Sequence, residues 1–301
     1  MHQFDPDLEQ PPRKLFTLEE ALHFTRGFTN RPFTGSRGFK GFLNESRWDN
    51  VIVAEGDPEF DLLRDEILRN SERGLFLAIS NYRRGLDLLS SASAMWAQVT
   101  MYYASYYAAT SILGLFGAVV DAPVRAILVG QGKPTHQELV SYVWTDFSPT
   151  RGESHRRFWE TYYQLVSPLR DFLGPAASDA IEPFKDLRTW QIEQRNLVNY
   201  DSRIALDLGL AFRTDFDPAR FPESLPGSLR IQHLLTKATT DLALRLFHSC
   251  GLDTGHMREI LPGANLVSLL EEYVGRTASA FPPSRPLLLG TTPEDPPPRL
   301  Y

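Results

Sequence analysis

Apolar residues recur along most of the chain at alternating steps of three and four positions, which is the period of an amphipathic α-helix. The clearest stripe consists of Leu75, Ile79, Tyr82, Leu86 and Leu89. A second stripe follows the serines at 90–91 and consists of Tyr102, Tyr106, Ala109, Leu113 and Phe116. Small residues next to the second stripe permit a close neighbour, so we expect the two helices to pack as an antiparallel pair.

The same period predicts helices elsewhere: short ones near Phe16 and over 264–274, and longer ones over 153–173, 180–208 and 229–250. Ser228 is the expected N-cap of the last long helix, and Gly251 is expected to end it. No stretch shows the regular alternation of several strands, and only 121–150 and 205–215 leave room for minor strands. The predicted fold class is therefore all-α.

Two segments lack this period and are expected to lie outside the helical bundle, which we assign to residues 61–278. Residues 1–60 are predicted to form an irregular arm with one short helix, and residues 279–301 a disordered, proline-rich tail. Between 25 and 48, basic residues alternate with aromatic ones. These aromatic side chains either plug into grooves of the domain or form a cationic strip on which nucleic-acid bases stack.

Composition and charge limit where this 301-residue chain can reside and which ligands it can bind. The first ten residues are acidic and lack a hydrophobic stretch, so we expect no secretory signal. No apolar run reaches the roughly 20 residues of a membrane span, and together these features predict a cytoplasmic protein without membrane contact. Cys250 is the only cysteine, and the seven histidines lack metal-binding spacing, so neither a metal site nor a cofactor is expected. With a net charge of −6, any nucleic-acid contact requires a local basic site.

The most unusual polar cluster lies in the second half of the predicted helix over 180–208. On a helix, Arg195 and Asn199 are neighbours four residues apart, as are Asn196 and Tyr200. A guanidinium can hold a phosphate through paired hydrogen bonds, and amide and phenol groups can orient it. The candidate RNA- or nucleotide-binding residues are therefore Arg195, Asn196, Asn199, Tyr200 and Arg203. The structural interpretation is that Arg195 pairs with an acidic side chain and that Tyr200 covers the edge of the core.

Two segments of the chain together resemble the HEPN superfamily of helical domains. The first is the aromatic and alanine-rich stretch from Trp96 to Leu113, and the second is Arg195-Asn196-Leu197-Val198-Asn199-Tyr200. The resemblance covers about residues 62–210. It implies a HEPN-like helical bundle that often forms homodimers. In the nuclease members, an arginine and a histidine in an R-x4-H motif cleave RNA without a metal ion and leave a 2′,3′-cyclic phosphate.

Arg195 and Asn196 match the arginine of that motif and the polar residue after it, whereas Tyr200 occupies the histidine position. An unperturbed tyrosine has a pKa of about 10 and is a poor general base at neutral pH. The chain resembles the branch in which R-x-x-A/V-D/N-Y replaces R-x4-H. The resemblance therefore implies a protein of a defence or toxin–antitoxin-type system that binds RNA or a nucleotide around Arg195, with weak or no nuclease activity. Arg195 and Tyr200 are its candidate catalytic residues.

Two alternatives stay open. In the first, the chain is a helical interaction or scaffold protein, and the polar cluster is an oligomer interface or contacts a partner protein. In the second, it is an active metal-independent ribonuclease that uses a base outside the motif. His155, His233 and His248 are the candidates for that base, but the sequence does not place any of them near Arg195.

Overall fold

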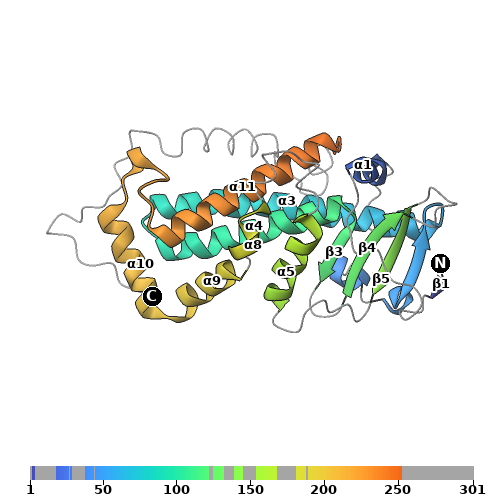
Figure 1. The fold of residues 1–301 in the computed structure, drawn as a ribbon, viewed down its shortest axis with the longest axis horizontal. Helices are drawn as coiled ribbons and strands as arrows, with labels where there is room; N and C mark the ends of the chain where they lie inside the picture. Colours follow the sequence, from blue (N-terminus) through green and yellow to red (C-terminus); the bar gives the residue numbers. More distant parts are fainter. Residues whose placement is uncertain are drawn as a thin grey trace.

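The structure, a computed structural model of the chain, is predominantly helical, as the sequence predicts. It describes residues 2–3, 18–26, 28, 38–43, 45–121, 125–131, 139–144, 154–167, 181–187 and 189–252. Three long helices form its body, namely α3 (Pro58–Ser90), α4 (Ala94–Leu115) and α11 (Gly227–Ser249). Figure 1 shows them side by side, with a sheet at one end of the body and α10 (Ser202–Asp215) at the other.

α3 and α4 form the predicted antiparallel pair, and all five residues of the first apolar stripe are buried. The two helices lie close together because glycines of each face the other. A Cβ added to Gly114 would lie 2.7 Å from the Cβ of Ser71, and one added to Gly85 would lie 2.8 Å from Cγ of Met101. A larger side chain at either glycine would push the pair apart.

α11 packs against α4 and α3 and completes the helical core. Gly251 ends it as predicted, with a φ of +65° in the left-handed region that favours glycine. The predicted N-cap is wrong, because α11 already begins at Gly227. The hydroxyl of Ser228 instead donates a 3.3 Å hydrogen bond to the side chain of Gln98 on α4. Ser228 thus joins the first turn of α11 to α4.

The predicted continuous helix over 180–208 is also wrong. The structure divides this region into α8 (Phe184–Leu187), α9 (Trp190–Tyr200) and α10. Asp201 interrupts it with an extended backbone, at φ −109° and ψ 103°. Its carboxylate accepts hydrogen bonds from the N–H groups of Arg203 at 2.9 Å and Ile204 at 3.4 Å, and this capping starts a new helix. α10 also covers 205–215, so this segment is helical and forms no strand.

Two further predicted helices are confirmed. The one near Phe16 is α1 (Leu18–Arg26), and the one over 153–173 is α5 (Ser154–Val166), with positions 168–173 outside the described residues. The predicted helix over 264–274 and the predicted tail over 279–301 lie outside the described residues. Of the helices that the structure describes, none has the length and apolar character needed to cross a membrane.

The described residues also form a five-stranded antiparallel sheet in the order β1-β2-β5-β4-β3. Its strands are β1 (His2–Gln3), β2 (Val51–Ala54), β3 (Ala118–Asp121), β4 (Arg125–Gln131) and β5 (Leu139–Trp144). β4, β5 and the end of β3 fall in the segment 121–150, where the sequence allows minor strands. β2 is missed, because a run of four apolar residues shows no alternation. The sheet is thus an addition to a predominantly helical body.

Part of the segment assigned to the arm packs into the core. α2 (Gly38–Leu43) and the 3-10 helix η1 (Ser46–Trp48) carry aromatic side chains that are buried, namely Phe39, Phe42 and Trp48. Arg47 pairs with Glu45 at 2.7 Å, and its guanidinium carbon lies 4.7 Å from the Trp48 ring centroid. For the described residues, these contacts favour packing over base stacking as the role of the basic aromatic strip. Phe33 of that strip lies outside the described residues.

Candidate functional site

α9 is held against α4 and α11 by a face that combines apolar and amide side chains. Ile192 and Val198 are buried, and the side-chain oxygen of Gln191 accepts a 2.9 Å hydrogen bond from Gln232 of α11. Both glutamines are fully buried, so this amide pair fixes the rotation of α9 about its axis. Arg195 follows Gln191 by four residues and therefore lies on the same side of α9, where that side reaches the surface.

The Arg195 guanidinium lies between Asn196 and two tyrosines of α4. Nη1 donates a 2.6 Å hydrogen bond to Oδ1 of Asn196, and Nη2 donates a 3.3 Å hydrogen bond to the hydroxyl of Tyr103. The guanidinium carbon lies 5.5 Å from the ring centroid of Tyr102 and 5.7 Å from that of Tyr103, within the range of cation–π attraction. The side chain is partly exposed and forms no ion pair with any described residue. The internal ion pair of the structural interpretation therefore has no partner in the described part of the chain.

Tyr102 connects Arg195 to His155 of α5. The Tyr102 hydroxyl lies 2.9 Å from Nδ1 of His155 and accepts a 3.3 Å hydrogen bond from the indole N–H of Trp159. Burial raises the pKa of Tyr102, and the hydrogen bond from Trp159 and the charge of Arg195 offset only part of that rise. The hydroxyl thus keeps its proton at neutral pH and can donate it to Nδ1. The Tyr102 oxygen can equally accept a hydrogen bond from Nδ1–H of the other His155 tautomer, which leaves the lone pair of Nε2 free.

His155 shares its aromatic surroundings with Arg195. Its ring centroid lies 5.8 Å from that of Tyr102 and 6.5 Å from that of Tyr103, the two rings that the guanidinium also contacts. We define the Arg195 cluster as Arg195, Asn196, Tyr102, Tyr103 and His155. The sequence singles out the aromatic and alanine-rich stretch that contains both tyrosines and links it to Arg195 through the family resemblance, but it gives no signal that these two rings contact the guanidinium.

The structure does not bring the remaining predicted site residues into this cluster. Asn199 is exposed, and Tyr200 is exposed to 80%. The side chain of Arg203 is exposed to 89% and lies 3.5 Å from the carboxylate of Asp201. Within the described structure, none of the three forms a hydrogen bond, ion pair or ring contact with Arg195. They lie at the junction of α9 and α10, where they can meet only a ligand that extends beyond the Arg195 cluster.

The other two candidate bases differ from His155 in their surroundings. His233 is buried between α11 and α3, with Nδ1 3.3 Å from the hydroxyl of Tyr82. Burial lowers its pKa to about 4, and the charge of Lys237 adds to this shift. His233 is therefore neutral and sealed from solvent at pH 7. The side chain of His248 lies outside the described residues.

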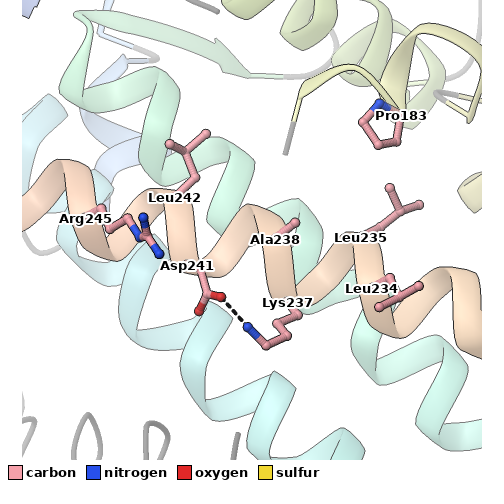
Figure 2. A pocket seen from close by; sticks show the side chains of 8 residues that line it. All are labelled: Pro183, Leu234, Leu235, Lys237, Ala238, Asp241, Leu242 and Arg245. Carbon is pink, nitrogen blue, oxygen red and sulfur yellow. Dashed lines mark hydrogen bonds and ion pairs between the residues drawn. The ribbon is translucent and has the colours of Figure 1, made fainter. Parts of the chain in front are cut away.

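A separate groove lies along α11, with a volume of about 340 Å³ (Figure 2). Figure 2 shows its walls, which are Pro183, Leu234, Leu235, Lys237, Ala238, Asp241, Leu242 and Arg245. Lys237 and Asp241 neutralise each other across 2.6 Å, and the remaining wall is mostly apolar. No residue of the Arg195 cluster lines this groove, so its chemistry adds nothing to the predicted phosphate site.

Comparison of the chain with models of known families, with curated proteins and with solved structures returned no significant match. The function is therefore inferred from the geometry of the Arg195 cluster. In that geometry, the partly exposed Arg195 of α9 lies beside the half-buried ring of Tyr103 and near the imidazole of His155, over the fully buried ring of Tyr102. These groups together suit a ligand that contains both an anion and a planar ring.

Proposed function

We propose that this chain is a HEPN-like helical protein that binds RNA or a nucleotide at the Arg195 cluster. The observation that supports this most is that Arg195, a partly exposed residue, places its guanidinium against two tyrosine rings and forms no ion pair with a described residue. An arginine that served only the fold would normally meet an acidic side chain in such surroundings. A phosphate from outside can supply the missing negative charge.

The hydrogen bonds of Arg195 leave room for a phosphate. A guanidinium has five N–H groups, and the two hydrogen bonds to Asn196 and Tyr103 occupy one on Nη1 and one on Nη2. Nε is buried without a hydrogen-bond partner. One N–H therefore remains on each terminal nitrogen, which matches the two oxygen atoms that a phosphate offers to arginine. A nucleobase could then stack beside the guanidinium on the half-buried ring of Tyr103.

Retention of labelled single-stranded RNA by purified protein tests this proposal. Arg195→Ala is expected to weaken binding about tenfold to a hundredfold, because paired hydrogen bonds between charged groups are lost. Arg195→Lys keeps the charge but loses the paired hydrogen-bond donors, so we expect its RNA affinity to lie between those of wild type and Arg195→Ala. Wild-type affinity is expected to fall as salt rises.

Arg230→Ala is the matched control, because Arg230 is exposed on α11 and lies outside the cluster. Its RNA affinity is expected to stay within about twofold of wild type. The proposal fails if Arg195→Ala retains wild-type affinity, or if Arg230→Ala loses as much affinity as Arg195→Ala.

A second candidate function is metal-independent RNA cleavage, with His155 in place of a motif histidine. It is favoured by one observation: His155 contacts both tyrosines that Arg195 contacts, whereas Tyr200 is exposed and contacts none of them. In the tautomer that carries its N–H on Nδ1, His155 would take the proton of a ribose 2′-hydroxyl at Nε2 while Arg195 holds the adjacent phosphate. The 2′-oxygen would then attack phosphorus, and the 5′-oxygen would leave with a proton from water.

Product analysis separates cleavage from binding. If His155 is the base, His155→Ala lowers cleavage about 10²–10⁴-fold while the RNA is still retained, and Tyr200→Phe cleaves like wild type. The expected product of the wild-type protein is a 2′,3′-cyclic phosphate. Absence of this product from wild-type reactions would eliminate the second candidate and leave the binding proposal intact.

A further inference from the structure

α4 exposes a stripe of mostly aromatic side chains along one side. We define the α4 open face as Trp96, Thr100, Tyr103 and Tyr107, which follow each other at intervals of four, three and four residues and therefore share this side. Trp96 is exposed to 53%, and the other three are partly exposed. Trp96 forms no ring contact with a described residue. Its large indole surface is therefore available to a ligand.

α11 packs against the opposite side of α4 and leaves the α4 open face uncovered. The hydroxyl of Ser105 lies 2.9 Å from that of Thr236 on α11. Successive residues of a helix are rotated by about 100°, so Ser105, two residues after Tyr103, lies on nearly the opposite side of α4. The α4 open face thus points away from α11.

Arg84 of α3 faces the same way as the α4 open face. Tyr82 of α3 points toward α11, where its hydroxyl lies 3.3 Å from Nδ1 of His233. Arg84 follows Tyr82 by two residues and therefore lies on nearly the opposite side of α3. It is exposed and forms no ion pair with a described residue. The α3–α4 pair thus presents a free cation and a row of rings on one side.

The packing of α3 on α4 places Arg84 level with the first half of the α4 open face. A Cβ added to Gly85, the next residue, would lie 2.8 Å from Cγ of Met101 and 3.7 Å from the carbonyl oxygen of Ala97. Positions 97 and 101 lie between the first and third residues of the α4 open face. Arg84 is therefore at the level of the gap between Trp96 and Tyr103.

Arg195 adds a second cation to this face. Its guanidinium carbon lies 5.7 Å from the ring centroid of Tyr103, and it too forms no ion pair with a described residue. α4 itself carries no charged residue, so Arg84 of α3 and Arg195 of α9 set the charge along the α4 open face. Cations beside a row of aromatic rings are the groups with which proteins bind single-stranded nucleic acids. In a chain of net charge −6, they form a local positive site.

We propose that the α4 open face, together with Arg84 and Arg195, binds a single strand of RNA several nucleotides long, with one base stacked on Trp96. This inference rests on the proposed function, because Arg195 holds a phosphate of the same strand. Trp96 and Tyr103 are seven residues, or about 10.5 Å, apart along α4, whereas stacked bases follow each other at about 3.4 Å. One base therefore does not span both rings, and a free nucleotide would leave Trp96 unused. A duplex keeps its bases paired and does not offer them to the rings.

Fluorescence anisotropy with a labelled oligoadenylate of about ten nucleotides tests the proposal. Trp96→Ala is expected to weaken binding about fivefold to hundredfold, because a stacked base loses its ring. Trp96→Phe keeps an aromatic face and is expected to retain most of the affinity. Arg84→Ala is expected to lower the slope of log affinity against log salt by about 0.7, the value for one phosphate contact on a single strand. A duplex of the same length is expected to bind more weakly than the single strand.

Leu234→Ala and Arg230→Ala are the matched controls for Trp96→Ala and Arg84→Ala. Leu234 is exposed to 46% and Arg230 is also exposed, but both lie on α11. Both variants are expected to bind the oligoadenylate within about twofold of wild type. Far-UV circular dichroism of each variant confirms that its helices are intact.

The outcomes separate this inference from the proposed function. If folded Trp96→Ala keeps wild-type affinity while Arg195→Ala loses it, the extended strand is refuted and binding at the Arg195 cluster stands. The same result is expected if a helix of a partner protein covers the α4 open face instead. Equal affinity for single strand and duplex also overturns the inference. If wild type does not bind the oligoadenylate at all, the proposed function and this inference fail together.

Discussion

His233 makes the folding stability of this protein sensitive to acid. Its side chain is 3% exposed, and its ring packs against Phe221 with the centroids 4.8 Å apart. Nδ1 lies 3.3 Å from the hydroxyl of Tyr82. Burial, with a contribution from the charge of Lys237, lowers the pKa of His233 to about 4. The folded protein therefore keeps this histidine neutral under conditions in which the unfolded chain protonates it.

The size of the effect follows from the two pKa values. A histidine in the unfolded chain titrates near pH 6.5. Between about pH 6.5 and pH 4, the unfolded state binds one proton more than the folded state, so the free energy of unfolding falls as the pH falls. The slope is about 1.4 kcal/mol per pH unit, and His233 alone removes about 3 kcal/mol by pH 4. This is a large part of the roughly 5–15 kcal/mol that stabilises a typical domain.

Urea unfolding of wild type and His233→Gln over this pH range measures the effect. Glutamine can still form a hydrogen bond with Tyr82 but does not titrate, so other titrating groups cancel when the two proteins are compared. From about pH 7 to pH 4, the difference in unfolding free energy is expected to shift by about 3 kcal/mol in favour of His233→Gln. A difference that stays constant with pH would refute the reasoning.

Glu72 is expected to act in the opposite direction. Burial raises the pKa of its carboxyl group to about 7 despite nearby arginines, so its contribution to stability is complete below about pH 4.5 and is lost as the pH rises through 7. Thermal unfolding should therefore show Glu72→Gln to be more stable than wild type at about pH 8 and equal to it at about pH 4.5; equal melting temperatures at both would contradict this. Gly114→Ala places a Cβ 2.7 Å from that of Ser71 and is expected to cost about 1–3 kcal/mol in chemical denaturation. Gly209→Ala is its control, since no atom lies within 4 Å of a Cβ added at Gly209, and this variant should stabilise the folded protein by up to about 1 kcal/mol. Similar effects at the two glycines would argue against close packing of α3 and α4.

The helical body is predictable from the sequence because its determinants are local. The apolar stripe from Leu75 to Leu89 repeats over several turns, so its period identifies α3 without knowledge of its neighbours. Gly251 likewise ends α11 through its own backbone freedom. In both cases the information lies within a few residues of the element that it defines.

The errors arise where a second influence competes with the local pattern. The apolar period continues across Asp201, but the carboxylate of that residue caps the next turn and divides the helix. β2 consists of four apolar residues, and only its pairing with β5, where Val51 lies opposite Val143, shows that they form a strand. Strand pairing joins residues that are distant in sequence, so no local period encodes it.

Part of the candidate site can likewise be predicted from the sequence, and part of it cannot. The sequence by itself singles out Arg195 and Asn196, because an arginine and an amide on a helix are conspicuous wherever that helix packs. Only the tertiary structure decides that Arg195 lies on Tyr102 and Tyr103, that His155 joins them, and that Tyr200 faces solvent. The sequence specifies the chemistry of each side chain. Which side chains come together in the site depends on how α4, α5 and α9 pack, and the core as a whole determines that packing.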